Sequence, residues 1–233
     1  MNRSLTQQQK QSFQDQGWLL LKGAVEKKAV LSVKQHVLSE LKRLNIWASG
    51  RMLSGSLKGI PAFQQITKLN QLVKHTGLQN KLISRELIDS IEELADSRLA
   101  SRQEPQLLLS LPNQGEWTLK NLNWHLDIQG STTVLPGVQA FVILDTLLSH
   151  GGGTLAVAGS HRMANVQRLY PLLKNGFIQD PDGTALKILE MTGSPGDVYL
   201  MDMRLIHTPS INSTKNVRMM ATVRFLRLDG SRG

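Results

Sequence analysis

His125 and Asp127 are the pair of residues in this chain most suited to chemistry. They lie two positions apart within Asn-Leu-Asn-Trp-His-Leu-Asp-Ile-Gln at residues 121–129. If this segment is a β-strand, alternation of side chains places the imidazole and the carboxylate side by side on one face. Together they supply two ligands of a 2-His-1-carboxylate metal site, the arrangement of non-haem Fe(II) oxygenases. The alternative is an amphipathic strand whose His-Leu-Asp triplet faces water.

A third ligand would have to come from His150, His161 or His207. His150 precedes three glycines and is expected on a turn, and His161 is expected to be fixed by local hydrogen bonds. His207 closes an expected strand at 197–207, where a barrel would have its mouth. We therefore favour His207, although an imidazole that continues an apolar face is often an ordinary buried histidine.

Arg218 begins the last expected strand, eleven residues after His207. Its guanidinium is a rigid fork that matches a carboxylate, so it could hold the far end of a dicarboxylic co-substrate. A surface arginine is the alternative. Strand alternation leaves the choice open, because Arg218 shares its face with Arg224 and a face with two arginines is not obviously interior.

The composition limits what the chain can be. With 233 residues, 40% of them hydrophobic, it can form one domain with a sizeable core. There is no cysteine, which excludes disulfides and thiolate ligands, so any metal must be held by nitrogen and oxygen. The polar N-terminus is unlike a secretory signal, and no apolar run is long enough to cross a bilayer. These features predict a soluble, cytoplasmic protein without a membrane partner.

The net charge of +9 is distributed unevenly. Residues 1–85 contain 14 Lys or Arg against 3 Asp or Glu, and residues 86–233 contain 13 against 15. A basic half could attract nucleic acid, anionic lipid or an anionic substrate. We expect no nucleic-acid partner, because no helix-turn-helix or zinc-finger spacing is present and aromatic residues make up only 5%. A solvated basic surface is the simplest interpretation.

The pattern of apolar residues predicts a mostly helical layer over residues 1–105 and a β core over 106–230. Helical spacing is found at 26–45 and at 85–98, where Ser84 suits an N-cap. Glycine and proline interrupt residues 46–81, which could hold short helices or a loop folded over a site. Short strands are expected at 17–23, 106–111, 119–129, 137–147, 154–157, 185–190, 197–207 and 217–228. The seven strands of the second half suggest a sandwich or a barrel.

Several of these motifs occur in an order that resembles the phytanoyl-CoA dioxygenase family. The order is His125-Leu126-Asp127, Gly152-Gly153-Thr154, Gly159-Ser160-His161-Arg162, Gly196-Asp197, His207, Asn212 and Arg218. The segment at 13–21, with Gly17-Trp18, is also similar to that family's opening. The resemblance extends from about residue 13 to 226, and the spacing of the final histidine and arginine is its most specific part.

The resemblance implies a double-stranded β-helix, mainly β with flanking helices, that uses Fe(II), 2-oxoglutarate and O₂. By the family's pattern, His125, Asp127 and His207 would bind iron, and Arg218 would hold the distal carboxylate of 2-oxoglutarate. Family members often carry a serine two residues after the distal histidine. The residue here is proline, so Thr208 or Ser210 would supply that hydroxyl, with Ser210 preferred.

These observations predict an oxygenase that hydroxylates a C–H bond of a small molecule and releases succinate and CO₂. Five cations without an acidic neighbour in the 46–81 stretch suggest an anionic or polar substrate: Arg51, Lys58, Lys68, Lys74 and Lys81. Two alternatives remain: a cupin-like metalloenzyme that catalyses a non-oxidative reaction such as isomerisation, and an inactive β-sandwich binding module. The first would have no use for Arg218.

Overall fold

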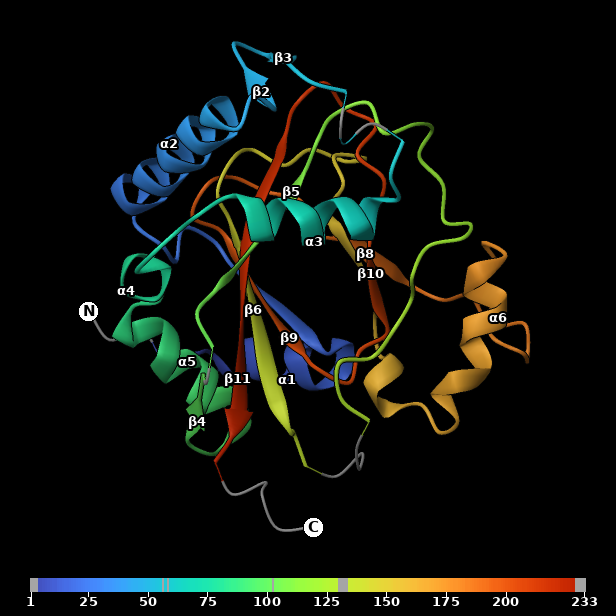
Figure 1. Cartoon of the computed structure of the whole chain (residues 1–233). Helices are drawn as coiled ribbons and strands as arrows, with labels where there is room; N and C mark the ends of the chain where they lie inside the picture. The colour runs from blue at the N-terminus through green and yellow to red at the C-terminus, as the bar shows by residue number, and fades with distance from the viewer. Residues whose placement is uncertain (1–3, 56, 58, 102, 130–133, 229–233) are drawn as a thin grey trace.

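Three β-sheets, six α-helices and two short 3-10 helices are found in the described part of this computed structural model, which comprises residues 4–55, 57, 59–101, 103–129 and 134–228 (Figure 1). The helices are α1 (Gln7–Gln16), α2 (Lys27–Arg43), α3 (Ala62–Leu72), α4 (Leu78–Leu82), α5 (Arg85–Ala95) and α6 (Leu169–Lys174). The strands of the large sheet are β1 (Trp18–Leu21), β4 (Leu99–Ala100), β5 (Gln106–Ser110), β6 (Gly137–Ile143), β9 (Val198–Asp202) and β11 (Arg218–Arg227). The small sheet contains β7 (Thr154–Val157), β8 (Ile188–Glu190) and β10 (His207–Pro209), and β2 (Trp47–Ala48) pairs with β3 (Arg51–Met52).

Strand β11 lies inside the large sheet, whose order is β1-β9-β6-β11-β4 with β5 also paired to β11. The small sheet has the order β10-β7-β8, and its pairings are antiparallel, as they are throughout the large sheet. Within the described residues the two sheets do not join into a closed barrel. Loops, and not a closed ring of strands, therefore connect the large sheet with the small sheet.

The two faces of β11 belong to different parts of the core. Met219, Ala221 and Val223 pack into the cluster shared with the helices, whereas Met220 joins a second cluster between the sheets. That second cluster draws on both sheets, for example through Phe141 on β6 and Ala156 on β7. Since side chains alternate along a strand, Arg218 shares the inner face with Met220.

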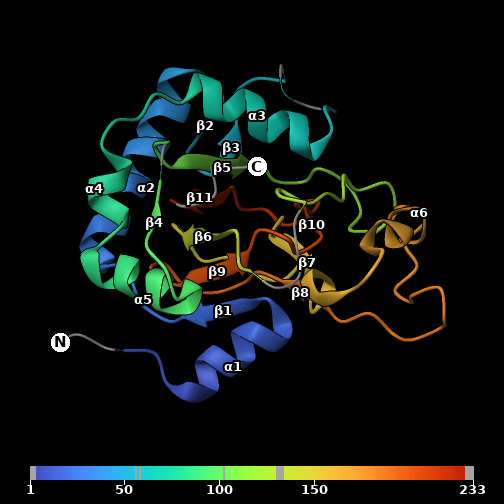
Figure 2. The ribbon, with the colours of Figure 1, turned by 90° about the horizontal axis from the view of Figure 1, so that it is seen from below.

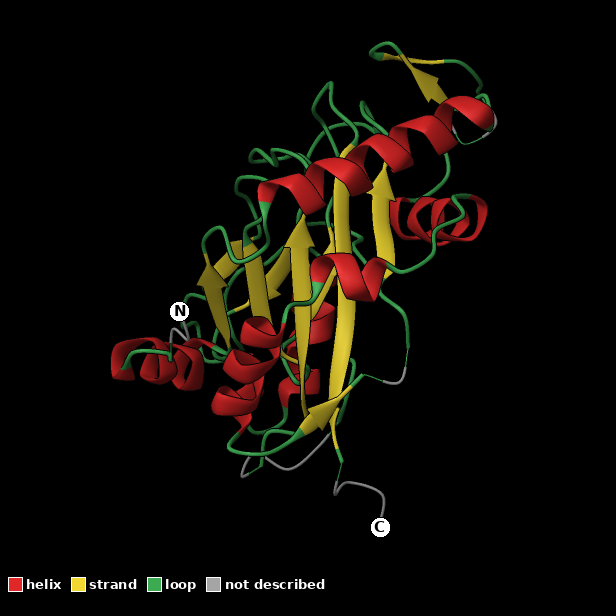
Figure 3. Cartoon of the chain, turned by 90° about the vertical axis from the view of Figure 1, so that its left-hand side faces the viewer, coloured by secondary structure: helices red, strands yellow, loops and turns green. Residues whose placement is uncertain are grey.

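The helices of the first half cover the outer face of the large sheet (Figure 2). Helix α3 lies across β5, and α2 follows one side of the same layer (Figures 2 and 3). Helix α2 places Val30, Val33 and Val37 in the core, at the spacing of an amphipathic helix. Among the described residues, no helix combines the length and apolarity needed to cross a membrane.

The expected fold class is confirmed: a β core of the double-stranded β-helix type with flanking helices. Helix α5 begins after Ser84, whose side chain accepts a hydrogen bond from the Leu87 amide as an N-cap does. The division at residue 105 is less clean than expected, because β1 and β4 come from the first half yet belong to the large sheet. Helix α1 was missed in the polar N-terminal segment, where Thr6 and Gln9 form a capping box.

Two of the expected strands were wrong. Residues 119–129 form no strand, and their one ladder contact is an isolated bridge between His125 and His207. The expected strand at 197–207 is two strands, because the chain turns after Asp202 and β10 begins at His207. In that turn the Asp202 carboxylate accepts a hydrogen bond from the Arg204 amide. This local bond favours a turn over a continued strand.

Candidate active site

A backbone bridge brings His125 and His207 together. The amide of each residue donates to the carbonyl of the other, at 3.0 Å in both directions, and the two ring centroids lie 4.3 Å apart. His207 belongs to β10 and is held by its pairing with Ala156 of β7. The irregular segment that carries His125 is therefore aligned by the small sheet.

Asp127 completes a group of three potential ligands. One ligand atom each from His125, Asp127 and His207 lies within 4.8 Å of the others. Oδ2 of Asp127 is 3.7 Å from Nε2 of His207. The next residue anchors the segment, because the Ile128 amide donates to the Met203 carbonyl at 3.2 Å. Two imidazoles and one carboxylate in such a cluster are a candidate metal site.

Both imidazoles present the same nitrogen to the centre. Nδ1 of His125 donates to the Asn123 carbonyl at 2.8 Å, and Nδ1 of His207 donates to the Leu205 carbonyl at 3.0 Å. A neutral ring whose Nδ1 carries the proton has a free lone pair on Nε2. Backbone carbonyls thus fix both rings in the tautomer that a metal requires.

His207 is held in its neutral form. Burial lowers the pKa of His207 to about 4, and the neighbouring His125 acts in the same direction, whereas Asp127 opposes it. A neutral imidazole can bind a metal and an imidazolium cannot. The ring is therefore ready for coordination at neutral pH without first losing a proton.

Arg218 lies inside the fold with one end of its guanidinium unused. The residue is 2% exposed, and Nε donates to the Leu108 carbonyl at 3.2 Å while Nη1 donates to the Gly152 carbonyl. Nη2 is buried without a hydrogen-bond partner, as is the hydroxyl of Ser110. Ser110 is directly opposite Arg218 in the β5–β11 pairing. A buried cation with a free donor is an unusual arrangement that suits an anionic ligand.

Arg218 contacts a glycine turn, Gly151-Gly152-Gly153, and Ser210 contacts the same turn. Ser210 donates its hydroxyl to the Gly153 carbonyl at 2.7 Å, one residue from the carbonyl that Arg218 uses. Ser210 and Arg218 therefore hold successive carbonyls of one turn and form no hydrogen bond with each other. Gly152 has φ +83°, and a Cβ there would lie 2.9 Å from the Ser110 hydroxyl. The turn packs too closely for side chains.

The other two histidines of the β half lie in different surroundings. His150 stacks on Trp117, with ring centroids 4.5 Å apart. Nε2 of His161 is 3.0 Å from the Gln14 carbonyl, so this ring contacts the end of α1. Neither belongs to the cluster of three. A hydrogen bond does hold His161, but it is not the local one expected, because Gln14 is 147 residues away along the chain.

Arg224 was not recognised as a site residue from the sequence. Its guanidinium grips Asp127 at two points: Nε donates to Oδ2 at 3.2 Å and Nη2 donates to Oδ1 at 3.1 Å. The available signal was its alternation with Arg218, which places both on the inner face of β11. The face with two arginines does point inward, but only Arg218 is buried, and the Arg224 side chain is 36% exposed.

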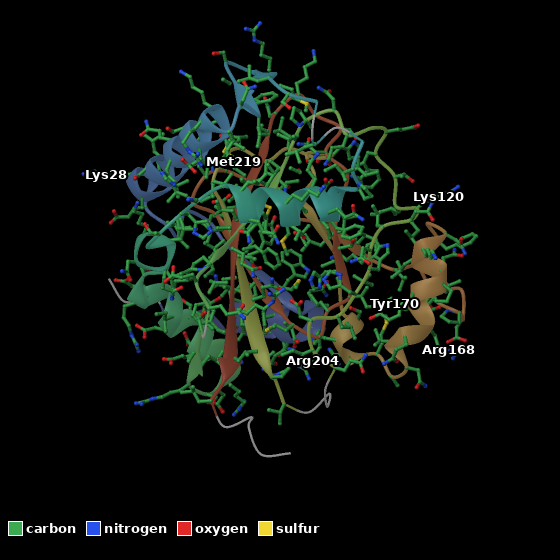
Figure 4. The ribbon with its side chains drawn as sticks, in the orientation of Figure 1. Lys28, Lys120, Arg168, Tyr170, Arg204 and Met219 are labelled. Carbon is green, nitrogen blue, oxygen red and sulfur yellow. The ribbon has the colours of Figure 1, made fainter. Side chains whose placement is uncertain are left out.

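A cavity of about 910 Å³ is lined in part by the chain segments that carry the two histidines, although His125, Asp127, His207 and Arg218 themselves do not line it. Asn123 and Pro209 line it, and each is two residues from one of the histidines. Several of the described residues between Trp47 and Gln65 form another part of its wall. Three cations reach the lining, Arg51, Lys120 and Lys215, and no carboxylate does among the described lining residues. Figure 4 shows Lys120 near the right-hand edge of the molecule.

The cations that line this cavity are mostly not the ones expected from the sequence. Arg51 is the only one of the five suggested cations that lines it among the described residues. Lys81 lines a second cavity elsewhere, beside α4 and α5, and Lys58 lies outside the described residues. The second half contributes the other two cations, although its net charge is negative. Net charge by segment was therefore a poor guide to local charge.

Comparison of sequences decides the family. The family model for phytanoyl-CoA dioxygenase (PhyH) matches residues 13–220, nearly the whole chain. This chain belongs to the phytanoyl-CoA dioxygenase family. No curated protein matches the chain.

Solved structures confirm the fold. The chain is similar to the α-ketoglutarate-dependent carbocyclase SnoK from nogalamycin biosynthesis, with a TM-score of 0.68, 16% identity, and coverage of 98% of this chain and 86% of that one. It is also similar to EctD from S. alaskensis, solved with 2-oxoglutarate and 5-hydroxyectoine (TM-score 0.62, 16% identity, coverage 98% and 78%). The epimerase SnoN is a third (TM-score 0.62, 17% identity, coverage 94% and 82%). At these identities the likeness concerns the fold.

Proposed function

We propose that this protein is an Fe(II)- and 2-oxoglutarate-dependent oxygenase that hydroxylates a C–H bond of a small molecule and releases succinate and CO₂. The observation that carries the proposal is the combination of a two-histidine, one-carboxylate cluster with a buried arginine that has a free donor. SnoK and SnoN are described as α-ketoglutarate-dependent, EctD was solved with 2-oxoglutarate, and SnoN and EctD were also solved with iron.

The residues present fit the metal. His125, Asp127 and His207 offer two neutral nitrogens and one carboxylate oxygen, a donor set that suits Fe(II). The absence of cysteine leaves no competing thiolate ligand. Bound Fe(II) would supply the oxidising chemistry that couples decarboxylation of 2-oxoglutarate to oxidation of the substrate. His125, Asp127 and His207 would hold the ion, and the remaining coordination would be left to the co-substrate and O₂.

The residues also fit the co-substrate. The free Nη2 of Arg218 would donate to the distal carboxylate of 2-oxoglutarate, and the unpaired hydroxyl of Ser110 lies opposite on β5. Ser110 is thus the hydroxyl that would accompany Arg218, in place of Ser210, whose hydroxyl donates to the Gly153 carbonyl of the glycine turn. Burial lowers the pKa of Arg218 to about 9, which reflects the cost of a buried cation without a counter-ion. A dianionic co-substrate would remove that cost.

The cavity beside Asn123 and Pro209 is the proposed substrate chamber. Its lining combines an apolar wall, for example Trp47 and Leu122, with the three cations. A small anionic or polar molecule with an apolar body would match both properties. The proposed location in the cytoplasm stays a prediction from the sequence.

The two alternatives explain less of the structure. A non-oxidative metalloenzyme would need the metal cluster but would leave Arg218 buried without a purpose. A binding module would need neither the neutral His207 nor the fixed tautomers. The presence of both features in one fold therefore favours the oxygenase.

Anaerobic titration tests this function. The metal-free protein is mixed with Fe(II), and 2-oxoglutarate is then added while the visible spectrum is recorded. We expect a charge-transfer band only when both are present, and succinate formation when air is admitted. Iron binding without such a band would favour the non-oxidative enzyme, and absence of iron binding would favour the binding module.

A further inference from the structure

Asp127 is a ligand candidate on an irregular segment, and something must hold its carboxylate. Residues 119–129 form no strand, so the regular ladder of a sheet does not fix this side chain. By contrast, Arg224 lies on β11, where Arg224 pairs with Gln139 of β6 in the middle of the large sheet. The contact between the two side chains therefore ties a loop carboxylate to a strand that is paired on both sides in the large sheet.

The geometry of this contact distinguishes the two carboxylate oxygens. Oδ2 lies toward the centre, 3.7 Å from Nε2 of His207, and Oδ1 is held by Nη2 of Arg224 at 3.1 Å. Nε of Arg224 reaches Oδ2 at 3.2 Å. The Asp127 side chain is 10% exposed and that of Arg224 is 36% exposed, so the pair is partly shielded from water. Such a two-point grip has a fixed orientation that a single charge would lack.

We infer that Arg224 is a positioning residue that keeps Oδ1 of Asp127 occupied, so that the carboxylate offers one oxygen to the metal. This inference rests on the proposed function. A carboxylate free to use both oxygens would occupy an additional position on the ion. The co-substrate and O₂ both need such positions, so the second oxygen has to be restrained.

An exposed ion pair on the surface would contribute less to the position of its carboxylate. The Arg162–Asp15 pair, for example, joins side chains that are 60% and 44% exposed, and pairs of this kind contribute little. Arg224 instead meets a mostly buried carboxylate that also faces two histidines. Loss of a partner that orients a metal ligand typically lowers metal affinity or activity by about 10- to 100-fold.

The test measures metal binding without co-substrate or turnover. Mn(II) is titrated into the metal-free protein, and free Mn(II) is quantified by electron paramagnetic resonance. We expect Arg224→Met to weaken binding about tenfold or more, and Arg224→Lys to recover part of the loss. Arg227→Met is the matched control, because Arg227 lies on the same strand and donates to the Ala95 carbonyl away from the cluster. Its affinity should equal that of the unchanged protein.

A second readout separates positioning from general damage to the fold. Co(II) replaces Mn(II), and the visible absorption bands, which report the number and arrangement of ligands, should change in Arg224→Met but not in Arg227→Met. In an Asp127→Asn background, Arg224→Met should add no further loss, because the residue acts through Asp127. Unchanged Mn(II) affinity and Co(II) bands in Arg224→Met would overturn the inference. An unchanged protein that binds neither ion would instead overturn the proposed function.

Discussion

Arg218 is the side chain that would let this site bind an anion inside the fold, because it is buried and Nη2 has no hydrogen-bond partner. Its burial beside two carbonyls would be unfavourable without a carboxylate to complete the pair. In the sequence, Arg218 and Arg224 look equivalent, because they share a strand face. The structure gives them different tasks: one is buried with a free donor, and the other grips a metal-ligand candidate.

We predict that Arg218→Ala removes most of the affinity for 2-oxoglutarate and leaves Fe(II) binding in place. Loss of one partner of a buried charge pair costs about 3–5 kcal/mol, which corresponds to roughly a hundredfold or more in affinity. Arg218→Lys should recover only part, since an ammonium cannot fork. Both affinities are measured anaerobically, with Arg227→Ala as control. Unchanged 2-oxoglutarate affinity in Arg218→Ala would contradict the proposed role.

His207 makes the stability of the metal-free protein depend on pH. Its pKa is about 4 in the folded state, against about 6.5 when unfolded, so the unfolded chain binds more protons between these values. Stability should therefore be full above pH 6.5 and should fall as the pH drops toward 4. We therefore expect stability to decrease from pH 7 to pH 5, where the unfolded ring takes up a proton and the folded ring does not.

Urea unfolding at the two pH values measures this effect, and His207→Gln removes the titrating group. The variant should lose less stability than the unchanged protein over the same interval. Bound metal should oppose the loss, because it stabilises the neutral imidazole. Equal pH dependence in both proteins would assign the effect to other groups.

At the scale of elements, an irregular segment at 119–129 carries two of the three candidate ligands, and hydrogen bonds to other segments hold it in place. The His-Leu-Asp spacing predicted that His125 and Asp127 lie close together, and they do. The reason given was wrong, because no strand exists there, and an isolated bridge to β10 together with the Ile128–Met203 hydrogen bond aligns the segment. Local patterning cannot reveal such a bridge, since its partner is about 80 residues away. The grip of Arg224 on Asp127 was unpredictable for the same reason.

Strands with strong apolar patterns were predicted well. The strand expected at 154–157 agrees with β7 at both ends, and β11 begins one residue after its expected start. Both contain mostly buried residues, so the pattern of the sequence reflects the core directly. The turn after Asp202 was missed, because the Met203-Arg204-Leu205 segment continues the alternation while a side-chain hydrogen bond reverses the chain.

The glycine turn at 151–153 gives a prediction at this scale. A Cβ on Gly153 would lie 2.3 Å from the Met191 carbonyl, so Gly153→Ala must displace backbone. We expect a loss of about 1–3 kcal/mol in the free energy of unfolding, together with weaker 2-oxoglutarate binding because Arg218 uses the neighbouring carbonyl.

Gly55→Ala is the matched control, since nothing lies within 4 Å of a Cβ at that position. Its stability, measured by urea unfolding, should differ little from that of the unchanged protein. Equal effects of the two substitutions would show that the turn tolerates a side chain. The packing argument for the glycine run would then be wrong.

For the whole molecule, the distribution of charge matters more than the net value of +9. The cavity gathers cations from both halves of the chain and no acid among its described lining residues. We predict that Lys120→Gln combined with Lys215→Gln lowers affinity for an amphipathic anion, 8-anilinonaphthalene-1-sulfonate, by about fivefold. Each partly exposed charge contributes about 0.2–1 kcal/mol.

Fluorescence titration measures this affinity, and Lys68→Gln with Lys74→Gln provides a control of equal charge away from the cavity. Added salt should weaken probe binding to the unchanged protein more than to the cavity variant, because salt screens exposed charges. Equal affinities in the two double variants would remove the argument for an anionic substrate.

The position of β1 has a consequence for how the protein is made. β1 pairs with β9, and about 180 residues separate the partners along the chain. At about 5–20 residues per second, a ribosome would need roughly 10–35 seconds to reach β9 after β1 has been synthesised. Throughout that interval Leu19 and its neighbours have no sheet to join, so the nascent chain exposes an unpaired apolar strand. Chaperone binding during synthesis would be most useful at this segment.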